Sequence, residues 1–130
     1  ETQGKLFRRF QREHPHADGE DFVSAYMRGN TRARIDDAAA VLSNMTASEL
    51  QDVFLNQEGY VIRPGHPIDP LAADWIGQFY AYCQWRTGGR SRDIIARIPA
   101  RVMCAAYPGL HDLDMRLAVE RVAANVIPLR

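Results

Sequence analysis

The cluster His111-Asp112-Leu-Asp114 contains the residue types that acid–base chemistry needs. An imidazole titrates near neutral pH and a neighbouring carboxylate can orient it, which is the arrangement of a general acid or base. The same residues also fit the start of a helix, with Asp112 or Asp114 as the N-cap and His111 in the preceding turn. We favour the helix start, and a small enzyme that uses His111 and Asp114 remains an alternative.

Five arginines gather in the segment from residue 86 to residue 101, against a single acid, Asp93. They are Arg86, Arg90, Arg92, Arg97 and Arg101. An apolar helix and a glycine turn precede a second short helix here, an order that suggests a DNA-reading helix-turn-helix. That second helix, however, is rich in isoleucine rather than in the Gln, Asn, Arg or Ser that usually contact bases. A basic rim facing an acidic protein partner fits these arginines as well, so both kinds of partner stay open.

Signals for a metal or a cofactor are weak. The pair His14-Pro-His16 has no further ligand at a familiar spacing, and Cys83 and Cys104 lack a Cys-x-x-Cys partner. Both cysteines lie in apolar helical patterns, where a thiol acts as a small hydrophobe. We therefore expect no metal, no cofactor and two buried thiols.

Length and composition are typical of one globular domain. The chain has 130 residues, of which 46% are hydrophobic, enough for one packed core. Sixteen Lys and Arg residues balance sixteen Asp and Glu residues, so the chain lacks the positive surplus of a general nucleic-acid binder. No apolar run approaches the ~18 residues of a membrane span, and we expect a cytoplasmic protein of bacterial type with no membrane partner.

Hydrophobic residues recur at helical spacing along most of the chain, so we predict an all-α fold. The prediction is a single compact domain, residues 1–130, of seven or eight short helices packed around a buried central helix at about 70–86. Residues 60–68 differ, because their composition favours a strand at first and two prolines and a glycine then break helices. They are predicted to form an extended connector.

The predicted central helix is apolar on nearly every side from Pro70 to Arg86, which is the pattern of a helix buried all round. Gly77 in its middle lowers helix propensity by ~1 kcal/mol relative to alanine. A neighbouring helix that crosses closely at Gly77 would explain why glycine stands there.

Capping residues predict where several helices begin. A capping box starts at Thr46, and Ser91 is expected to cap the helix that follows the glycine turn. Residues 32–42 are predicted to form one helix. The adjacent acids Asp36-Asp37 are expected near a helix start, where the helix dipole favours negative charge.

Three stretches resemble the C-terminal part of small helical bacterial proteins of unknown function. They are Asp74-Trp-Ile-Gly-Gln-Phe-Tyr-Ala-Tyr, Ser91-x-x-Ile94 and Tyr107-Pro-Gly-Leu-His-x-Leu-Asp114, and the resemblance covers about residues 70–125. Such proteins are associated with loci that resemble toxin–antitoxin modules, in which they would be the antitoxin-like partner of a toxin. The resemblance implies binding to a partner protein and carries over no catalytic residue.

These patterns predict a non-enzymatic protein–protein interaction domain, antitoxin-like by resemblance, or one that associates with itself. The aromatic residues of the central helix and the arginines after it are typical interface anchors. Nucleic-acid binding through residues 86–101 is the first alternative, and the small enzyme is the second. We expect the functional surface at the basic end of the central helix and in the turns beyond it, from Arg86 to Asp114.

Overall fold

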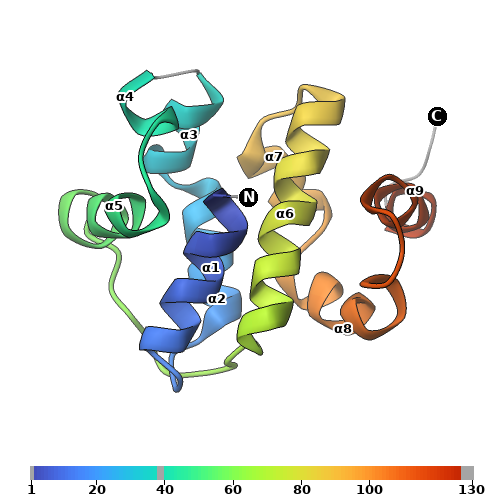
Figure 1. The fold of residues 1–130 in the computed structure, drawn as a ribbon, viewed down its shortest axis with the longest axis horizontal. Helices are drawn as coiled ribbons and strands as arrows, with labels where there is room; N and C mark the ends of the chain where they lie inside the picture. Colours follow the sequence, from blue (N-terminus) through green and yellow to red (C-terminus); the bar gives the residue numbers. More distant parts are fainter. Residues whose placement is uncertain (1, 38–39, 127–130) are drawn as a thin grey trace.

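The computed structural model describes residues 2–37 and 40–126, which fold into helices and connections with no strand among them (Figure 1). The helices are α1 (Thr2–Glu13), α2 (Gly19–Arg28), α3 (Asn30–Asp36), α4 (Ala40–Ser43), α5 (Ala47–Asp52), η1 (Val53–Gln57), α6 (Pro70–Thr87), α7 (Ser91–Arg97), α8 (Ala100–Leu110) and α9 (Met115–Val126). α5 continues directly into η1, a turn of π-helix, and α4 is a single turn. None of these helices is long and apolar enough to cross a membrane. The predicted all-α fold is confirmed, and the helices pack into one compact arrangement.

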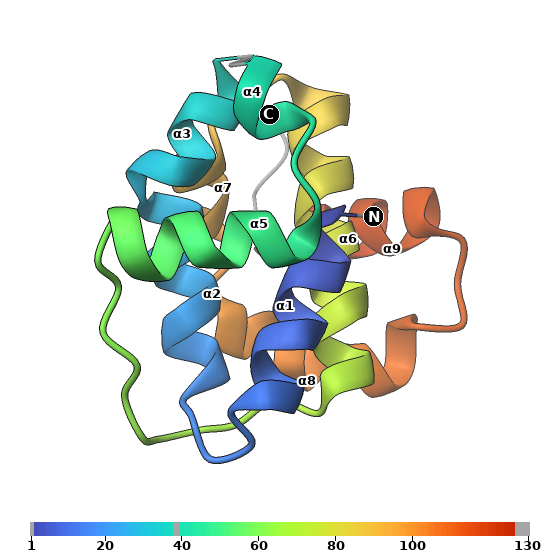
Figure 2. The same cartoon turned by 60° about the vertical axis from the view of Figure 1, so that its left-hand side comes forward.

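Helix α6 is the central element, as predicted. It contacts α1, α7, α8 and α9, and Ile76, Phe79 and Tyr80 are among its fully buried residues. α1 packs along α6, and Figures 1 and 2 show the two helices next to each other. A Cβ atom on Gly77 would lie only 2.7 Å from the Cα atom of Gly4 on α1. The predicted close crossing at Gly77 is therefore confirmed, and it is a crossing between two glycines.

One side of α6 is exposed, which corrects the prediction of a helix buried all round. Trp85 is 74% exposed and Leu71 is 55% exposed. α1 packs on the side of Gly77, whereas α8 and α9 reach the side of Trp75 and Arg86, and a stripe between these two sides stays open. This stripe, the exposed side of α6, carries Leu71, Gln78 and Trp85.

A second part of the core is a cluster of aromatic rings from α1, α2 and η1 with the residues after it. Phe10 stacks on Phe22 with ring centroids 3.6 Å apart, and Phe54 stacks on Tyr60 at 5.1 Å. Aromatic rings bury much apolar surface for each residue, so this cluster fixes the inward side of α1. The outward side of α1 is thereby left to charged residues.

The predicted helix over residues 32–42 is wrong in its bounds. α3 ends at Asp36, and residues 38–39 lie outside the described part of the chain. Asp36 and Asp37 therefore stand at the end of a helix rather than near its start. The helix dipole disfavours a carboxylate there, so other groups must stabilise these two acids.

The residues between η1 and α6 are extended and pass beneath α1 and α2 in Figure 1. The Asp18 N–H donates a hydrogen bond to the carbonyl oxygen of Arg63 at 2.7 Å, and the Tyr60 hydroxyl donates to the Asp21 carboxylate at 2.7 Å. These bonds tie the connector to the start of α2. Val61 in the same segment is exposed.

Candidate functional site

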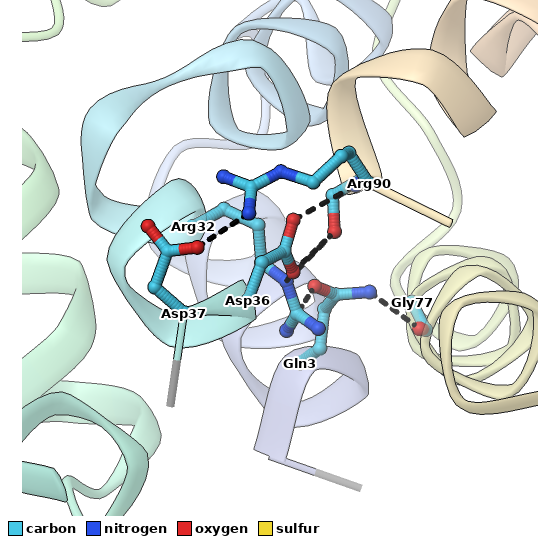
Figure 3. A network of polar contacts seen from close by, with 7 residues as sticks. Gln3, Arg32, Asp36, Asp37, Gly77 and Arg90 are labelled. Carbon is cyan, nitrogen blue, oxygen red and sulfur yellow. Dashed lines mark hydrogen bonds and ion pairs between the residues drawn. The ribbon is translucent and has the colours of Figure 1, made fainter. Parts of the chain in front are cut away.

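The five arginines of residues 86–101 do not form one patch. Arg86 on α6 faces α9, where its Nη2 lies 3.6 Å from the Glu120 carboxylate. Arg90 faces a different helix, α3, and its guanidinium donates a hydrogen bond to the Asp37 carboxylate (Figure 3). This hydrogen bond and the charge of Arg90 hold the pKa of Asp37 below its ordinary value. The first two arginines are thus tied to two separate helices.

The other three arginines are exposed on α7 and α8. Arg92 and Arg97 lie on the outer side of α7, and the side chain of Arg97 makes no hydrogen bond or ion pair with any described residue. Arg101 lines an open hollow of about 320 Å³ together with Asp18 and Asp21 at the start of α2. Acidic side chains therefore face Arg101. The basic segment is divided among several neighbourhoods of the surface.

The cluster at His111 takes the form of a helix start. The Asp114 carboxylate accepts the backbone N–H of Arg116 at 3.1 Å, so Asp114 caps the start of α9. His111 Nδ1 lies 3.4 Å from the Asp112 carboxylate, and its ring stacks on Tyr107 with centroids 4.7 Å apart. Both His111 and Asp112 are exposed. His111 therefore pairs with Asp112, whereas Asp114 binds the backbone at the start of α9.

A buried polar network positions α7 (Figure 3). The Asp36 carboxylate accepts the Ser91 N–H at 2.8 Å and the Ser91 hydroxyl at 2.9 Å. Arg32 Nε donates to the same carboxylate at 3.1 Å and to the Ser91 hydroxyl oxygen at 3.0 Å. The expectation that Ser91 caps α7 is wrong, because Arg90 is the N-cap residue and Asp36, 55 positions before Ser91, supplies the acceptor.

The network continues to α1 and α6. Arg32 Nη1 donates to Gln3 Oε1 at 3.0 Å, and Gln3 Nε2 donates to the Gly77 carbonyl oxygen at 2.8 Å. The side chains of Gln3, Arg32 and Ser91 are buried. The network therefore holds α1, α3, α6 and α7 together and does not present a surface to a partner.

A one-sided group of cations on α1 was missed by the sequence reasoning. Lys5, Arg8, Arg9 and Arg12 follow the spacing i, i+3, i+4, i+7, which places them on one side of the helix, and they are called here the α1 basic face. Together with Glu13 they line an open hollow of about 500 Å³. The helical period of residues 5–12 is the signal that would have found them, although the longer segment 86–101 holds more arginines.

Comparison with known proteins gives no family for this chain. No protein-family model, no curated protein and no solved structure matches it. The chemistry and geometry of the described residues are therefore the basis for a functional proposal.

The exposed side of α6, together with Tyr82 and Arg86 along its edge, is a second surface with partner-binding chemistry. The rings of Tyr82 and Trp85 are in contact, with centroids 5.6 Å apart, and Arg86 Nη1 donates to the Tyr82 hydroxyl oxygen at 3.4 Å. Trp, Tyr and Arg are the residue types that most often dominate the binding energy of protein interfaces. All three stand within five consecutive residues at the C-terminal end of α6.

Burial suppresses the chemistry of the two cysteines. Cys83 is buried and Cys104 is half-buried, and burial raises the pKa of both thiols to about 12. Both thiols therefore stay protonated at neutral pH, and a protonated thiol is a poor nucleophile. In the part of the chain that the structure describes, no three His, Cys, Asp or Glu side chains are grouped so that they could hold a metal ion.

Proposed function

We propose that this chain is a non-enzymatic protein–protein interaction domain that binds its partner through the exposed side of α6. The observation that carries the proposal is the exposure of Trp85, which is 74% accessible on a helix whose other sides are packed. A large apolar ring in water costs free energy that is recovered when a partner covers it. Trp85 is therefore the expected anchor of the interface.

Tyr82 and Arg86 support Trp85 in this role. Arg86 is held between the Tyr82 hydroxyl and the Glu120 carboxylate of α9, so its guanidinium is oriented before a partner arrives. A side chain that is already ordered loses less conformational entropy on binding. Leu117, which is also exposed, lies three residues before Glu120 on the same side of α9 and adds apolar area there.

An antitoxin-like role is one form of this proposal. The stretch from about residue 70 to residue 125, on which the resemblance rests, contains Trp85 and the whole of α6. In this form the partner is a toxin. Co-expression of wild-type chain with a toxin encoded beside it would then restore growth, and co-expression of Trp85→Ala would not.

The test combines affinity capture with a binding measurement. Tagged wild-type chain is added to an extract of its native host, and a protein that co-purifies in equal amount is then purified and titrated by calorimetry. Trp85→Ala is expected to weaken this binding about thirty-fold, which corresponds to the ~2 kcal/mol that a hot-spot residue contributes. Trp85→Phe should lose less, because it keeps an aromatic ring.

Val61→Ala is the control for this test. Val61 is exposed as Trp85 is, but it lies on the connector before α6. We expect it to bind the partner as the wild type does. The proposal fails if no stoichiometric partner is found and sedimentation shows no self-association, or if Trp85→Ala binds the partner as tightly as the wild type.

A further inference from the structure

We propose that the α1 basic face binds an acidic helical segment of the protein that covers the exposed side of α6. The inference rests on the proposed function for the class of partner, and it adds a second contact surface and the chemistry of the segment that occupies it. The cations concerned are Lys5, Arg8, Arg9 and Arg12 on α1.

The arrangement of these cations is unfavourable for the protein alone. Lys5 with Arg9 and Arg8 with Arg12 are like-charge pairs four residues apart, which destabilise a helix. Lys5 also lies in the first turn of α1, where the helix dipole disfavours a cation, and this turn of the described helix holds no acidic residue. An anionic segment bound along this side of α1 would turn each repulsion into an attraction.

Much of this positive charge has no strong partner inside the protein. The side chains of Lys5 and Arg12 make no hydrogen bond or ion pair with any residue that the structure describes. Arg8 makes one long contact, 3.4 Å from Nη1 to the Asp74 carboxylate, and its Nε has no hydrogen-bond partner. Arg9 pairs with the carboxylate one turn later at 3.1 Å, but both side chains are more than 40% exposed, where such a pair contributes little.

α1 is held in place by packing on its opposite side, and its cations lie beside the exposed side of α6. Its opposite side is buried in the core, and Gly4 lies against Gly77. Arg8, one turn after Gly4, reaches Asp74, so α1 runs antiparallel to α6 and its cations follow the edge of the exposed stripe. Figure 1 shows the two helices next to each other. A single partner can therefore contact both surfaces.

The charges on and around α1 select an acidic protein segment rather than a nucleic acid. The carboxylates of Glu13 and Asp74 lie among the four cations and would repel a dense row of phosphates. The chain as a whole has no positive surplus either. Glutamates at i, i+3, i+4 and i+7 of a partner helix repeat the axial spacing of the cations, so each carboxylate can meet one of them.

Fluorescence anisotropy with a defined probe tests the proposal on the full chain. The probe is a fluorescein-labelled amphipathic peptide with glutamates at i, i+3, i+4 and i+7, measured at low salt. The same peptide with glutamine in place of glutamate, and single- and double-stranded DNA of about 20 nucleotides, are the comparison probes. We expect the glutamate peptide to bind about tenfold more tightly than the glutamine peptide, and its affinity to fall as salt is added.

A pair of matched variants locates the binding. Lys5→Glu with Arg12→Glu is expected to weaken binding of the glutamate peptide by about tenfold or more. Arg97→Glu with Arg101→Glu makes the same change in net charge on exposed arginines of α7 and α8, and should stay within about twofold of wild type. If circular dichroism shows the first variant to be unfolded, Lys5→Gln with Arg12→Gln should give a smaller loss in the same direction.

Three results would overturn the proposal. Equal losses in the two charge-reversed variants would mean that binding follows net charge and not the α1 basic face. Tighter binding of either DNA than of the glutamate peptide would assign α1 to nucleic acid. Failure of the glutamate peptide to bind the wild type would contradict the proposal that α1 binds an acidic segment. The Trp85→Ala measurement with the natural partner would still decide the proposed function separately.

Discussion

The α1 basic face and the arginines of residues 86–101 are similar in charge but differ in geometry. On α1, four cations share one side of one helix because they follow the helical period. Between residues 86 and 101, the arginines are spread over α6, the turn after it, α7 and α8, and Arg86 and Arg90 are tied to different helices. The period of charged residues therefore shows better than their number whether they share one side of a helix.

The two regions also differ in what positions them. α1 is placed by a backbone contact, Gly4 against Gly77, together with the burial of its apolar side. α7 is placed by a buried network in which the Asp36 carboxylate is the central acceptor. The position of α1 depends on the absence of side-chain atoms at the glycine contact, and the position of α7 depends on the charge of Asp36. Different substitutions therefore disrupt them.

The largest expected effect is that of Asp36→Ala, which breaks the support of α7. The substitution removes the acceptor for Ser91 and leaves the buried guanidinium of Arg32 without its counter-ion. Removing one partner of a buried ion pair typically lowers the free energy of unfolding by about 3–5 kcal/mol, and we expect a loss of that size. Urea denaturation followed by circular dichroism measures it.

Asp37→Ala is the matched control for this prediction. Asp37 is the next residue, and its carboxylate pairs with Arg90 at the surface. Its removal should leave the urea midpoint nearly unchanged, because solvent screens an exposed ion pair. Similar losses in the two variants would mean that the buried network does not hold α7 in place.

An intermediate effect is expected from Gly77→Val, which breaks the support of α1. The added Cβ atom would lie 2.7 Å from the Cα atom of Gly4, and a backbone atom cannot rotate away. Overpacking of this kind typically costs 1–3 kcal/mol, and we expect about 3 kcal/mol for a branched side chain. Binding of the glutamate peptide should weaken as well, since α1 must shift away from α6.

Gly109→Ala in α8 separates crowding from the general effect of replacing a helical glycine. Apart from the neighbouring residues and backbone of its own helix, no described atom lies within 4 Å of a Cβ added at Gly109. Its free energy of unfolding should therefore stay the same or rise, by at most ~1 kcal/mol, because alanine favours a helix. A Gly77→Val variant as stable as the wild type would show that α1 and α6 can accommodate a side chain at their crossing without steric strain.

Local patterns were sufficient to predict the fold class, the central helix and one tertiary contact. The helical period of the apolar residues predicts the all-α fold and the position of α6. The capping box at Thr46 is confirmed, with the Thr46 hydroxyl oxygen accepting the Glu49 N–H at 3.2 Å and the Glu49 carboxylate accepting the Thr46 N–H at 2.9 Å. Gly77 predicts a crossing because a glycine inside a helix needs a packing reason.

The rest of the site depends on pairings that no local pattern contains. Asp36 and Ser91 are 55 positions apart, so the sequence around Ser91 indicates a cap of its own rather than a distant carboxylate. The exposure of Trp85 depends on which sides of α6 are covered by α1, α8 and α9, and an apolar helix alone does not specify that. The α1 basic face, in contrast, can be recognised from the spacing of residues 5–12 alone.

The smallest expected effect is on the free energy of unfolding when one cation of each region is reversed in charge. Its sign depends on how that cation lies in the dipole of its own helix. Lys5 lies in the first turn of α1, where the dipole disfavours it, and Arg97 lies in the last turn of α7, where the dipole favours it. Lys5→Glu is therefore expected to raise the free energy of unfolding by about 0.5 kcal/mol, and Arg97→Glu to lower it by about as much.

Thermal unfolding resolves these differences as shifts of about 2–3 °C in opposite directions. The two variants change the net charge equally, so opposite signs can only come from where each charge lies. A Lys5→Glu variant that is more stable but binds the glutamate peptide less tightly would show that Lys5 serves binding at the expense of the free protein, as functional residues often do. Loss of stability in both variants would instead mean that contacts within the protein hold Lys5, and α1 would then not differ from residues 86–101.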